Sequence, residues 1–393
     1  MKQGGPEPQR LISLDVFRGI TIAMMILVNN PGSWAHIHPP LRHAKWHGWT
    51  PTDLVFPFFL FIVGVSIALS FSRREKEGAT RRDLVQKILT RTFLIFACGL
   101  FLNWYPFGLP LSAEAVASFS LESIQESLAK LRIMGVLQRI ALCYLAVGLI
   151  VTLVQRTRTR ILCVVFCLFF YEILMRFPLV SGWGAGSFAL EDNLVRWLDL
   201  RLLGETHLWR GAGIPFDPEG ILSTLPAIVT TLAGFFTGEF LRRDEGEAAN
   251  QVRPLLVWGL LIAGSGLLLG LLEPINKQLW SSSYMFLTAG LAMVSLAGAI
   301  WAIDIRGWCS WVKPAVVFGS NPLVVFVGSG LLARTLGLLR TGEGISIQRW
   351  LYSNVFQPAA GDANGSLLQA FAHILLWFGV LWWLHRQRIF VKI

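Results

Sequence analysis

The chain alternates along its whole length between long apolar runs and shorter polar connectors. About ten of the runs could cross a hydrocarbon core about 30 Å thick as helices that rise about 1.5 Å per residue. Their predicted bounds are 11–30, 53–71, 84–104, 133–154, 161–177, 221–241, 255–272, 283–303, 314–331 and 367–384. In a bilayer a helix satisfies all of its backbone hydrogen bonds internally. The pattern therefore predicts an all-α protein, a polytopic transmembrane helix bundle of about ten spans.

Composition agrees with this class. Hydrophobic residues make up 54% of the chain and charged residues 15%, whereas soluble domains carry roughly a quarter charged residues. The net charge of +10 lies mostly in connectors and not on one face of a domain, so we expect a lipid bilayer as partner and no nucleic acid. The first run contains Asp15 and Arg18 and should remain as the first span, since it lacks the features of a cleavable signal peptide.

Lysines and arginines are concentrated in the shorter connectors on one side of the predicted membrane. These connectors are 1–13, 72–87, 155–160, 242–253, 304–313 and 385–393. By the positive-inside rule this side is cytoplasmic, which places both termini in the cytoplasm and the longer loops outside. Residues 1–10 form a cytoplasmic stub in this interpretation. The absence of an internal repeat or linker in the sequence predicts one transmembrane domain over residues 1–393.

Four of the seven histidines fall in the first outer loop, and Asp53 opens the helix that follows it. The four are His36, His38, His43 and His47. They lie in a loop, without an obvious carboxylate ligand and without the helical i, i+4 geometry of a metal site, so we expect no metal. The ordinary explanation for polar and aromatic residues at such a position is a location among lipid headgroups. That explanation also applies to Trp46.

Other polar residues lie at or near the outer ends of the predicted helices. They are Asn29, Arg132, Gln138, Arg139, Asp217, Glu219 and Asn276. Arg132 and Arg139 are seven residues apart, so they share one helix face. Arg139 lies about two turns inside an apolar helix, where an arginine needs a partner or a water-lined cavity.

Several stretches resemble the heparan-α-glucosaminide N-acetyltransferase family. They include Leu14-Asp15-Val16-Phe17-Arg18-Gly19-Ile20 and Arg42-His43-Ala44-Lys45-Trp46-His47-Gly48-Trp49-Thr50, and they continue at 53–64, 132–140, 216–222, 274–281, 319–324 and 388–393. The stretches follow the family's order and cover nearly the whole chain. The resemblance is to a smaller bacterial form that lacks the large luminal domain of the lysosomal enzyme. It implies a protein of the bacterial cytoplasmic (inner) membrane and, from the family, a homodimer.

The resemblance implies transfer of an acetyl group from acetyl-CoA to the amino group of a glucosamine-type sugar. His43 occupies the position of the family's active-site histidine, and Asn29 and Asp53 match its neighbouring polar residues. An imidazole can remove the proton of an ammonium near neutral pH, and an aspartate can orient the ring. We therefore expect His43 as general base, Asp53 as its partner and Asn29 as a donor to the thioester oxygen. Transient acetylation of His43 is an open alternative.

The resemblance and the charges together predict that Arg18, Arg132, Gln138 and Arg139 bind acetyl-CoA, with either end of this set as the site of the nucleotide. For the acceptor, Trp46 would stack on the sugar ring, and Asp217, Glu219 and Asn276 would bind its hydroxyl or ammonium groups. Two alternatives are an amino-sugar permease and an O-acetyltransferase of envelope glycans. The sequence shows no paired interrupted helices in matching halves of the chain, which is the usual indication of a permease.

Overall fold

The computed structural model describes residues 11–109, 120–177, 183, 186–243 and 248–391. The predicted cytoplasmic stub, residues 1–10, lies outside these ranges. Within them the regular structure is helical, and the only β-type contacts are two isolated bridges, Gly48 with Asn276 and Arg340 with Ser346. The predicted all-α class is confirmed.

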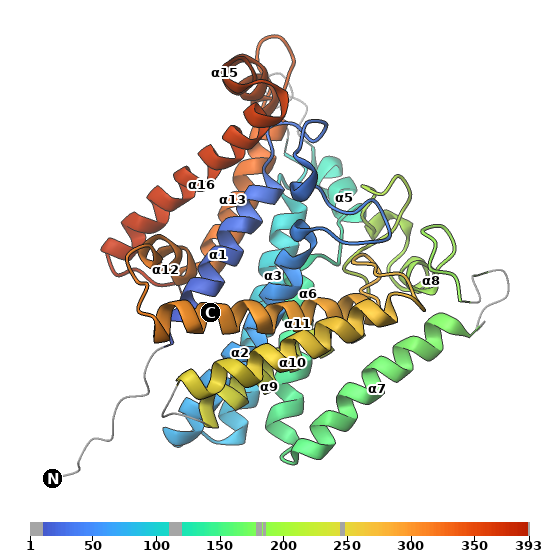
Figure 1. Cartoon of the computed structure of the whole chain (residues 1–393). Coiled ribbons are helices and arrows are strands. Elements are labelled where there is room, and N and C mark those ends of the chain that lie inside the picture. The colour runs from blue at the N-terminus through green and yellow to red at the C-terminus, as the bar shows by residue number, and fades with distance from the viewer. Residues whose placement is uncertain (1–10, 110–119, 178–182, 184–185, 244–247, 392–393) are drawn as a thin grey trace.

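The helices follow one another along the chain with mostly short connections (Figure 1). The longer ones are α1 (Ile12–Asn29), α2 (Val55–Lys76), α3 (Arg81–Trp104), α6 (Val136–Leu153), α7 (Thr157–Arg176), α9 (Thr224–Arg243), α10 (Ala248–Leu269), α11 (Ser282–Ala299), α13 (Pro322–Leu338) and α16 (Asp362–Arg386). Shorter helices are α5 (Leu121–Ala129), α8 (Leu194–Leu202), α12 (Val312–Ser320), α14 (Ile347–Leu351) and α15 (Gln357–Ala360). Short 3₁₀ helices lie at η1 (Pro39–Leu41), η2 (Pro51–Leu54) and η3 (Glu205–His207), and π-helical segments lie at η4 (Ile300–Ile305) and η5 (Tyr352–Phe356).

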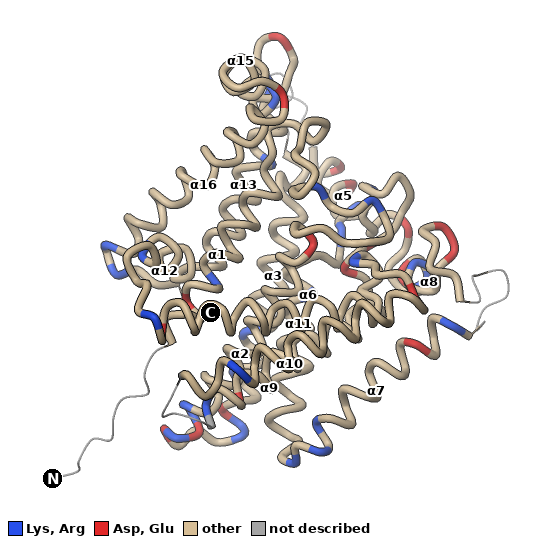
Figure 2. Tube along the Cα trace, viewed as in Figure 1, with Lys and Arg blue, Asp and Glu red and all other residues tan. Residues whose placement is uncertain are grey.

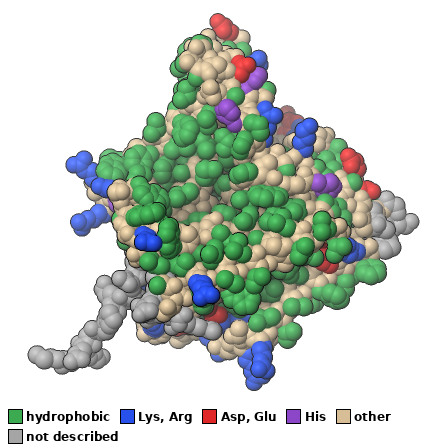
Figure 3. All heavy atoms as spheres, in the orientation of Figure 1, with side chains coloured by type: hydrophobic (Ala, Val, Ile, Leu, Met, Phe, Trp, Pro, Cys, Tyr) green, Lys and Arg blue, Asp and Glu red, His purple; other side chains and the backbone are tan. Residues whose placement is uncertain are grey.

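In the described part of the chain, 8 helices are long and apolar enough to cross a membrane, and the number rises to 9 if α12 and α13 together form one span. They are α1, α2 with η2, α3, α6, α9, α10, α11 with η4, and α16. The predicted run 161–177 corresponds to α7, which is a helix but is not among the eight. Figure 3 shows apolar side chains spread over the face in view, as a lipid-facing surface requires.

The predicted run 314–331 is not one straight helix. It is broken at Asn321, and α12 and α13 meet there at 81°. Pro322 disfavours helical backbone at the residue before it, and it is well accommodated at the start of the next helix. Asn321 stabilises the break, because its side chain donates to the Ile389 carbonyl at 3.0 Å and accepts from the Val391 amide at 2.8 Å. The prediction of one straight helix was wrong, because it relied on the apolar pattern and gave no weight to Pro322.

Close helix contacts hold the centre of the bundle together, and small residues permit them. Helices α2 and α9 pack along each other, as do α3 with α6 and α10 with α11. A Cβ atom at Gly64 would lie 1.9 Å from the Thr231 carbonyl oxygen, and one at Gly234 would lie 2.0 Å from the Phe61 oxygen. Glycine at both positions therefore lets the two backbones touch, as is common between membrane helices.

Charged side chains are unevenly distributed over the ends of the helices. Lysines and arginines gather at the C-terminal end of α2 and around the start of α7 (Figure 2). The loops that lead into η2, α6, α9 and α11 come together elsewhere and enclose a cavity at the other end of α2. Its lining includes six of the residues that the sequence singles out, which are Asn29, His43, Trp46, Asp53, Arg132 and Glu219.

Candidate functional site

A cavity of about 600 Å³ opens between α1, α2, α6 and α13 and the loops before α2, α6, α9 and α11. Its deeper part is apolar, with Met25, Phe56, Phe59, Ile140 and Phe326 on the wall. Its polar lining consists of Asn29, His43, Thr52, Asp53, Arg132, Glu219, Lys277 and Gln278, and three tryptophans, Trp34, Trp46 and Trp209, complete it. The cavity thus combines an apolar interior with a few convergent polar groups, as small-molecule sites commonly do.

His43 and Asp53 are in direct contact on the wall of this cavity. The His43 Nδ1 atom lies 2.6 Å from Asp53 Oδ1, and the side chain of His43 is 40% exposed while that of Asp53 is 1% exposed. The other ring nitrogen, Nε2, has no hydrogen bond to a described residue. A ring held at Nδ1 by a carboxylate and open at Nε2 has the geometry of an oriented general base.

The local fold fixes the Asp53 carboxylate from its other side. Asp53 Oδ2 accepts from the Ala44 amide at 3.1 Å, from the Thr50 amide at 3.0 Å and from the Thr50 hydroxyl at 3.1 Å. Thr50 and Asp53 form a capping box at the start of η2, with Pro51 at its first position. The capping box at the start of the second span therefore also orients the Asp53 carboxylate that contacts His43.

Lys277 is the third charged group at this point. Its Nζ atom lies 3.2 Å from Asp53 Oδ1 and 3.0 Å from His43 Nδ1. It comes from the loop before α11, which is distant in sequence, and it was not among the residues predicted for the site. The only signal in the sequence was its place in the stretch Pro274-Ile275-Asn276-Lys277.

Aromatic residues surround the opening of the cavity. The Trp46 indole donates to the Phe188 carbonyl at 2.8 Å, and its ring packs edge-on against Phe216 at a centroid distance of 5.3 Å. Trp209 lies against Gly211, where a Cβ atom would come within 1.9 Å of the indole ring. Trp46 was predicted for the site from the sequence and Trp209 was not, because a lone tryptophan in a loop has no distinguishing pattern.

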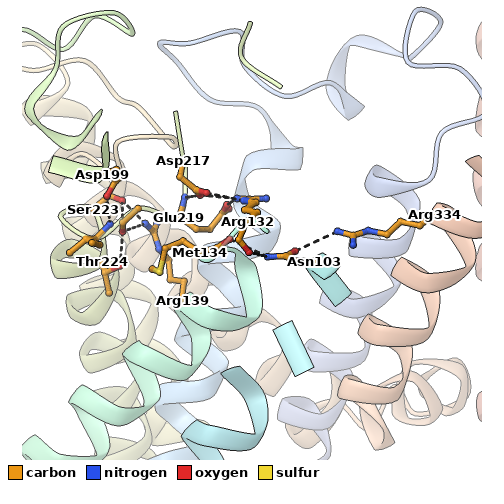
Figure 4. Close-up of polar contacts among 12 residues, drawn as sticks. Asn103, Arg132, Met134, Arg139, Asp199, Asp217, Glu219, Ser223, Thr224 and Arg334 are labelled. Carbon is orange, nitrogen blue, oxygen red and sulfur yellow. Dashed lines mark hydrogen bonds and ion pairs between the residues drawn. The ribbon is translucent and has the colours of Figure 1, made fainter. Parts of the chain in front are cut away.

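Arg132 is paired with both carboxylates that were predicted to bind the acceptor (Figure 4). Its Nε and Nη2 atoms donate to the two oxygens of Asp217 at 2.8 and 2.7 Å, and Nη2 also donates to Glu219 at 2.6 Å. Burial alone would lower the pKa of Arg132, but the hydrogen bonds and charges of Asp217 and Glu219 outweigh it and raise the pKa. Of the two carboxylates, Glu219 lines the cavity and Asp217 lies behind it.

Arg139 lies below this group and is 0% exposed. Its Nη2 atom donates to the Gly220 carbonyl at 2.9 Å and to the Ser223 hydroxyl (Figure 4). Asp199 lies on the other side of the same turn and accepts from the Ile221 amide at 2.9 Å. Burial raises the pKa of Asp199 to about 7. These groups hold the turn before α9, and Arg139 itself does not line the cavity.

The structure places three other predicted residues away from the cavity wall. Arg18, on α1, pairs with Asp15 at 3.2 Å and donates to the Ser66 hydroxyl at 3.3 Å. Gln138 is buried against Gly99. Asn276 is also buried, and its side-chain oxygen accepts from the Leu279 amide at 2.8 Å, so it shapes the loop that carries Lys277.

The remaining histidines of the first loop lie outside the cavity lining. His38 is hydrogen-bonded to Asn364 at 3.0 Å, and His36 lies 3.8 Å from Asp362, so both hold the loop against the start of α16. Burial lowers the pKa of His47, which lies 3.4 Å from the Asn276 amide nitrogen. Among the described residues, no group of three or more His, Cys, Asp or Glu side chains is arranged to hold a metal ion.

A second, more open cavity of about 390 Å³ adjoins the first. The two share Trp46, Trp209, Gly211 and Gln278. Lys45, His47 and Glu191 are the ionisable side chains on the lining of the second cavity. The two cavities are therefore neighbours, with Trp46 and Trp209 on the lining of both.

Comparison with known proteins gives a consistent result. The family model described as "Heparan-alpha-glucosaminide N-acetyltransferase, catalytic" matches residues 10–272. The heparan-α-glucosaminide N-acetyltransferase of Homo sapiens is 27% identical over 438 aligned residues, and that of Mus musculus is 26% identical over 436. Each alignment covers 98% of this chain and 60% of the relative, so the chain spans about three-fifths of the length of these proteins.

Proposed function

The chain belongs to the heparan-α-glucosaminide N-acetyltransferase family, and from that premise and the cavity geometry we propose that it transfers an acetyl group from acetyl-CoA to the amino group of a glucosamine-type sugar. The observation that carries the proposal is the contact of 2.6 Å between His43 and Asp53 on the wall of the 600 Å³ cavity. With Nδ1 bound to the carboxylate, Nε2 is the ring nitrogen that acts on the substrate.

The proposed reaction begins with an acceptor in its ammonium form. His43 Nε2 takes a proton from the ammonium, and the free amine attacks the thioester carbonyl carbon. A C–N bond forms and the C–S bond breaks. Of the two protons that the nitrogen loses in total, one goes to the departing CoA thiolate by way of the imidazolium and the other goes to solvent. In the alternative that stays open, His43 carries the acetyl group transiently before the amine attacks.

The cavity suits acetyl-CoA at its acyl end. Asn29 lies on the cavity wall and would provide an amide N–H for the thioester oxygen, where negative charge develops in the transition state. The apolar wall formed by Met25, Phe59 and Phe326 suits the acetyl group and the adjoining alkyl chain. For the phosphate end of acetyl-CoA, the predicted ligands remain Arg18, Arg132, Gln138 and Arg139.

The acceptor sugar would occupy the tryptophan-lined part of the cavity. Trp46 is fixed by its hydrogen bond to Phe188 and provides a flat face for the ring, and Glu219 presents a carboxylate to the ammonium. Asp217 and Asn276 support this wall from behind and would act through Glu219 and the loop before α11. The rest of a longer acceptor would extend past Trp209 into the second cavity.

We further propose that both termini are cytoplasmic, that the protein resides in a bacterial inner membrane as a homodimer, and that the cavity faces outward. The orientation is supported by the basic last turn of α2 and by the shorter basic connectors. Single cysteines at Gly78 and at Glu205 test it with an impermeant thiol reagent applied to intact cells. The proposal requires labelling at 205 and none at 78, and the reverse pattern would exclude an outward-facing cavity.

Purified protein with labelled acetyl-CoA and a panel of amino sugars tests the reaction itself. We expect CoA release that depends on the acceptor and a label that resists mild base, as an amide does. Label that mild base removes from the acceptor would favour the O-acetyltransferase. Binding and uptake of an amino sugar into proteoliposomes without CoA release would favour the permease.

A further inference from the structure

Lys277 contacts both members of the proposed base pair and has no role in the reaction as described so far. It lines the cavity, its side chain is 21% exposed, and its Nζ atom lies 3.2 Å from Asp53 Oδ1 and 3.0 Å from His43 Nδ1. The loop that carries it is fixed on both sides. The Asn276 amide donates to the Ser281 hydroxyl at 2.9 Å, and the Ile275 carbonyl accepts from the Gly48 amide at 2.7 Å.

The three distances determine where the hydrogens lie. A separation of 2.6 Å between Nδ1 and a carboxylate oxygen requires a proton between them, and that proton belongs to the ring. A protonated Nδ1 cannot also accept a hydrogen bond from an ammonium. Lys277 therefore donates to Asp53 Oδ1, the same oxygen that the ring uses, and its positive charge lies beside the ring edge.

The charges around the ring indicate what this contact does. Asp53 alone would favour the doubly protonated, cationic ring, which cannot act as a base. Lys277 opposes this effect from a similar distance. The other charged groups that face the ring across the cavity, Arg132 and Glu219, are paired with each other. Lys277 is therefore the cation that directly balances Asp53.

We infer that Lys277 is a positioning residue for acetyl transfer, which holds the Asp53 carboxylate in place and offsets its charge so that His43 stays neutral and able to take the acceptor's proton. This inference rests on the proposed function. It predicts that the importance of Lys277 depends on pH and on the presence of the Asp53 carboxylate.

The test compares Lys277→Met with Lys277→Arg and with Lys130→Met. Lys130 is an exposed lysine that also pairs with a carboxylate, Glu126, but it directly follows α5 and lies outside the cavity lining. For Lys277→Met, we expect the acid limb of the kcat/KM profile to move to higher pH by about one unit. A limb moved by one unit lowers kcat/KM by up to about tenfold at pH values below the limb and by very little at pH values well above it.

The other variants make the result specific. Lys277→Arg should restore the acid limb, because it retains the charge, and Lys130→Met should behave as wild type. In an Asp53→Asn background, Lys277→Met should cause little further loss of kcat/KM, because the base that the lysine assists is already disabled. The KM for acetyl-CoA should not change in any of them.

Three results would overturn the inference. One is an unchanged profile in Lys277→Met, and a second is an equal loss at all pH values, which indicates a structural role. The third is a raised KM for acetyl-CoA with an unchanged acid limb, which makes Lys277 a phosphate ligand. Failure of the proposed function is distinguishable from all three, because wild-type protein would then release no CoA in response to an acceptor.

Discussion

Replacing Asp53 by asparagine should reverse the tautomer of His43 while leaving the cap of the second span in place. Three donors, the Ala44 amide and the amide and hydroxyl of Thr50, face Asp53 Oδ2 at 3.0–3.1 Å. The oxygen of the new amide must take that position. Its NH₂ group then faces His43 Nδ1 and donates to it, so the ring proton moves to Nε2. The nitrogen that should act as the base then no longer has a free lone pair.

The expected loss follows from that change. Removing an effective general base lowers turnover by roughly 10² to 10⁴, which is about 3 to 5 kcal/mol in the activation free energy. We expect kcat of Asp53→Asn to fall within this range, with a smaller change in the KM for acetyl-CoA, because the base acts mainly in the transition state. The assay is acceptor-dependent CoA release, measured together with the thermal unfolding of each purified variant.

Asp83→Asn is the matched control. Asp83 and Thr80 form the same kind of capping box at the start of α3, with the Thr80 amide and hydroxyl 2.8 and 2.7 Å from Asp83 Oδ2. This aspartate has no histidine partner. It should therefore share any effect on the helix start, typically about 1 kcal/mol, and retain full turnover. A folded Asp53→Asn protein with kcat within threefold of wild type would refute the tautomer argument, and so would an equal loss in both variants.

Three further predictions follow from the described contacts. His43→Ala should lower kcat by roughly 10² to 10⁴, whereas His38→Ala, which loses only its contact with Asn364, should retain activity in the same CoA-release assay; equal activity of the two variants would contradict a role for His43. Arg139→Leu should lower the melting temperature, because it removes the buried guanidinium that donates to the Gly220 carbonyl and to the Ser223 hydroxyl, and unchanged stability with unchanged acetyl-CoA affinity would count against any role for this arginine. Asp199 has a pKa of about 7 in the fold and about 3.9 when unfolded, so the folded state binds its proton more tightly and stability should decline as pH rises from about 4 to about 7; Asp199→Asn should flatten that decline in melting temperatures taken at pH 5 and pH 8.

The membrane spans could be predicted from the sequence because each depends on a continuous apolar run. To predict the break between α12 and α13, one residue, Pro322, would have had to count for more than the run of apolar residues around it. The start of α6 is similar. Gly135 has extended backbone and the helix begins at Val136, so the predicted start at 133 was early by about one turn. Periodicity detects helices well, whereas their ends depend on single residues.

The candidate site could be predicted only in part, for a related reason. His43 and Asp53 are ten residues apart and belong to one recognisable motif, so their proximity was accessible from the sequence. Lys277 reaches the same point from a loop more than two hundred residues later. No local pattern indicates such a contact, because it depends on how α2, α9 and α11 pack. Helix packing likewise places Arg18 away from the cavity, although the motif that contains it was recognised in the sequence.

The charges of the two walls of the cavity differ, and the difference bears on turnover. On one wall, Lys277 balances Asp53. On the other, Glu219 presents its carboxylate to the cavity, and Arg132 divides its donors between Glu219 and Asp217. A protonated amino sugar is attracted to that wall, and its acetylated product is not, because the amide is neutral. The site should therefore bind the amine more tightly than its product, so that the loss of one charge in the reaction itself favours product release. An N-acetylated product that inhibits with a Ki below the KM of the amine would show that the Glu219 carboxylate plays no such part.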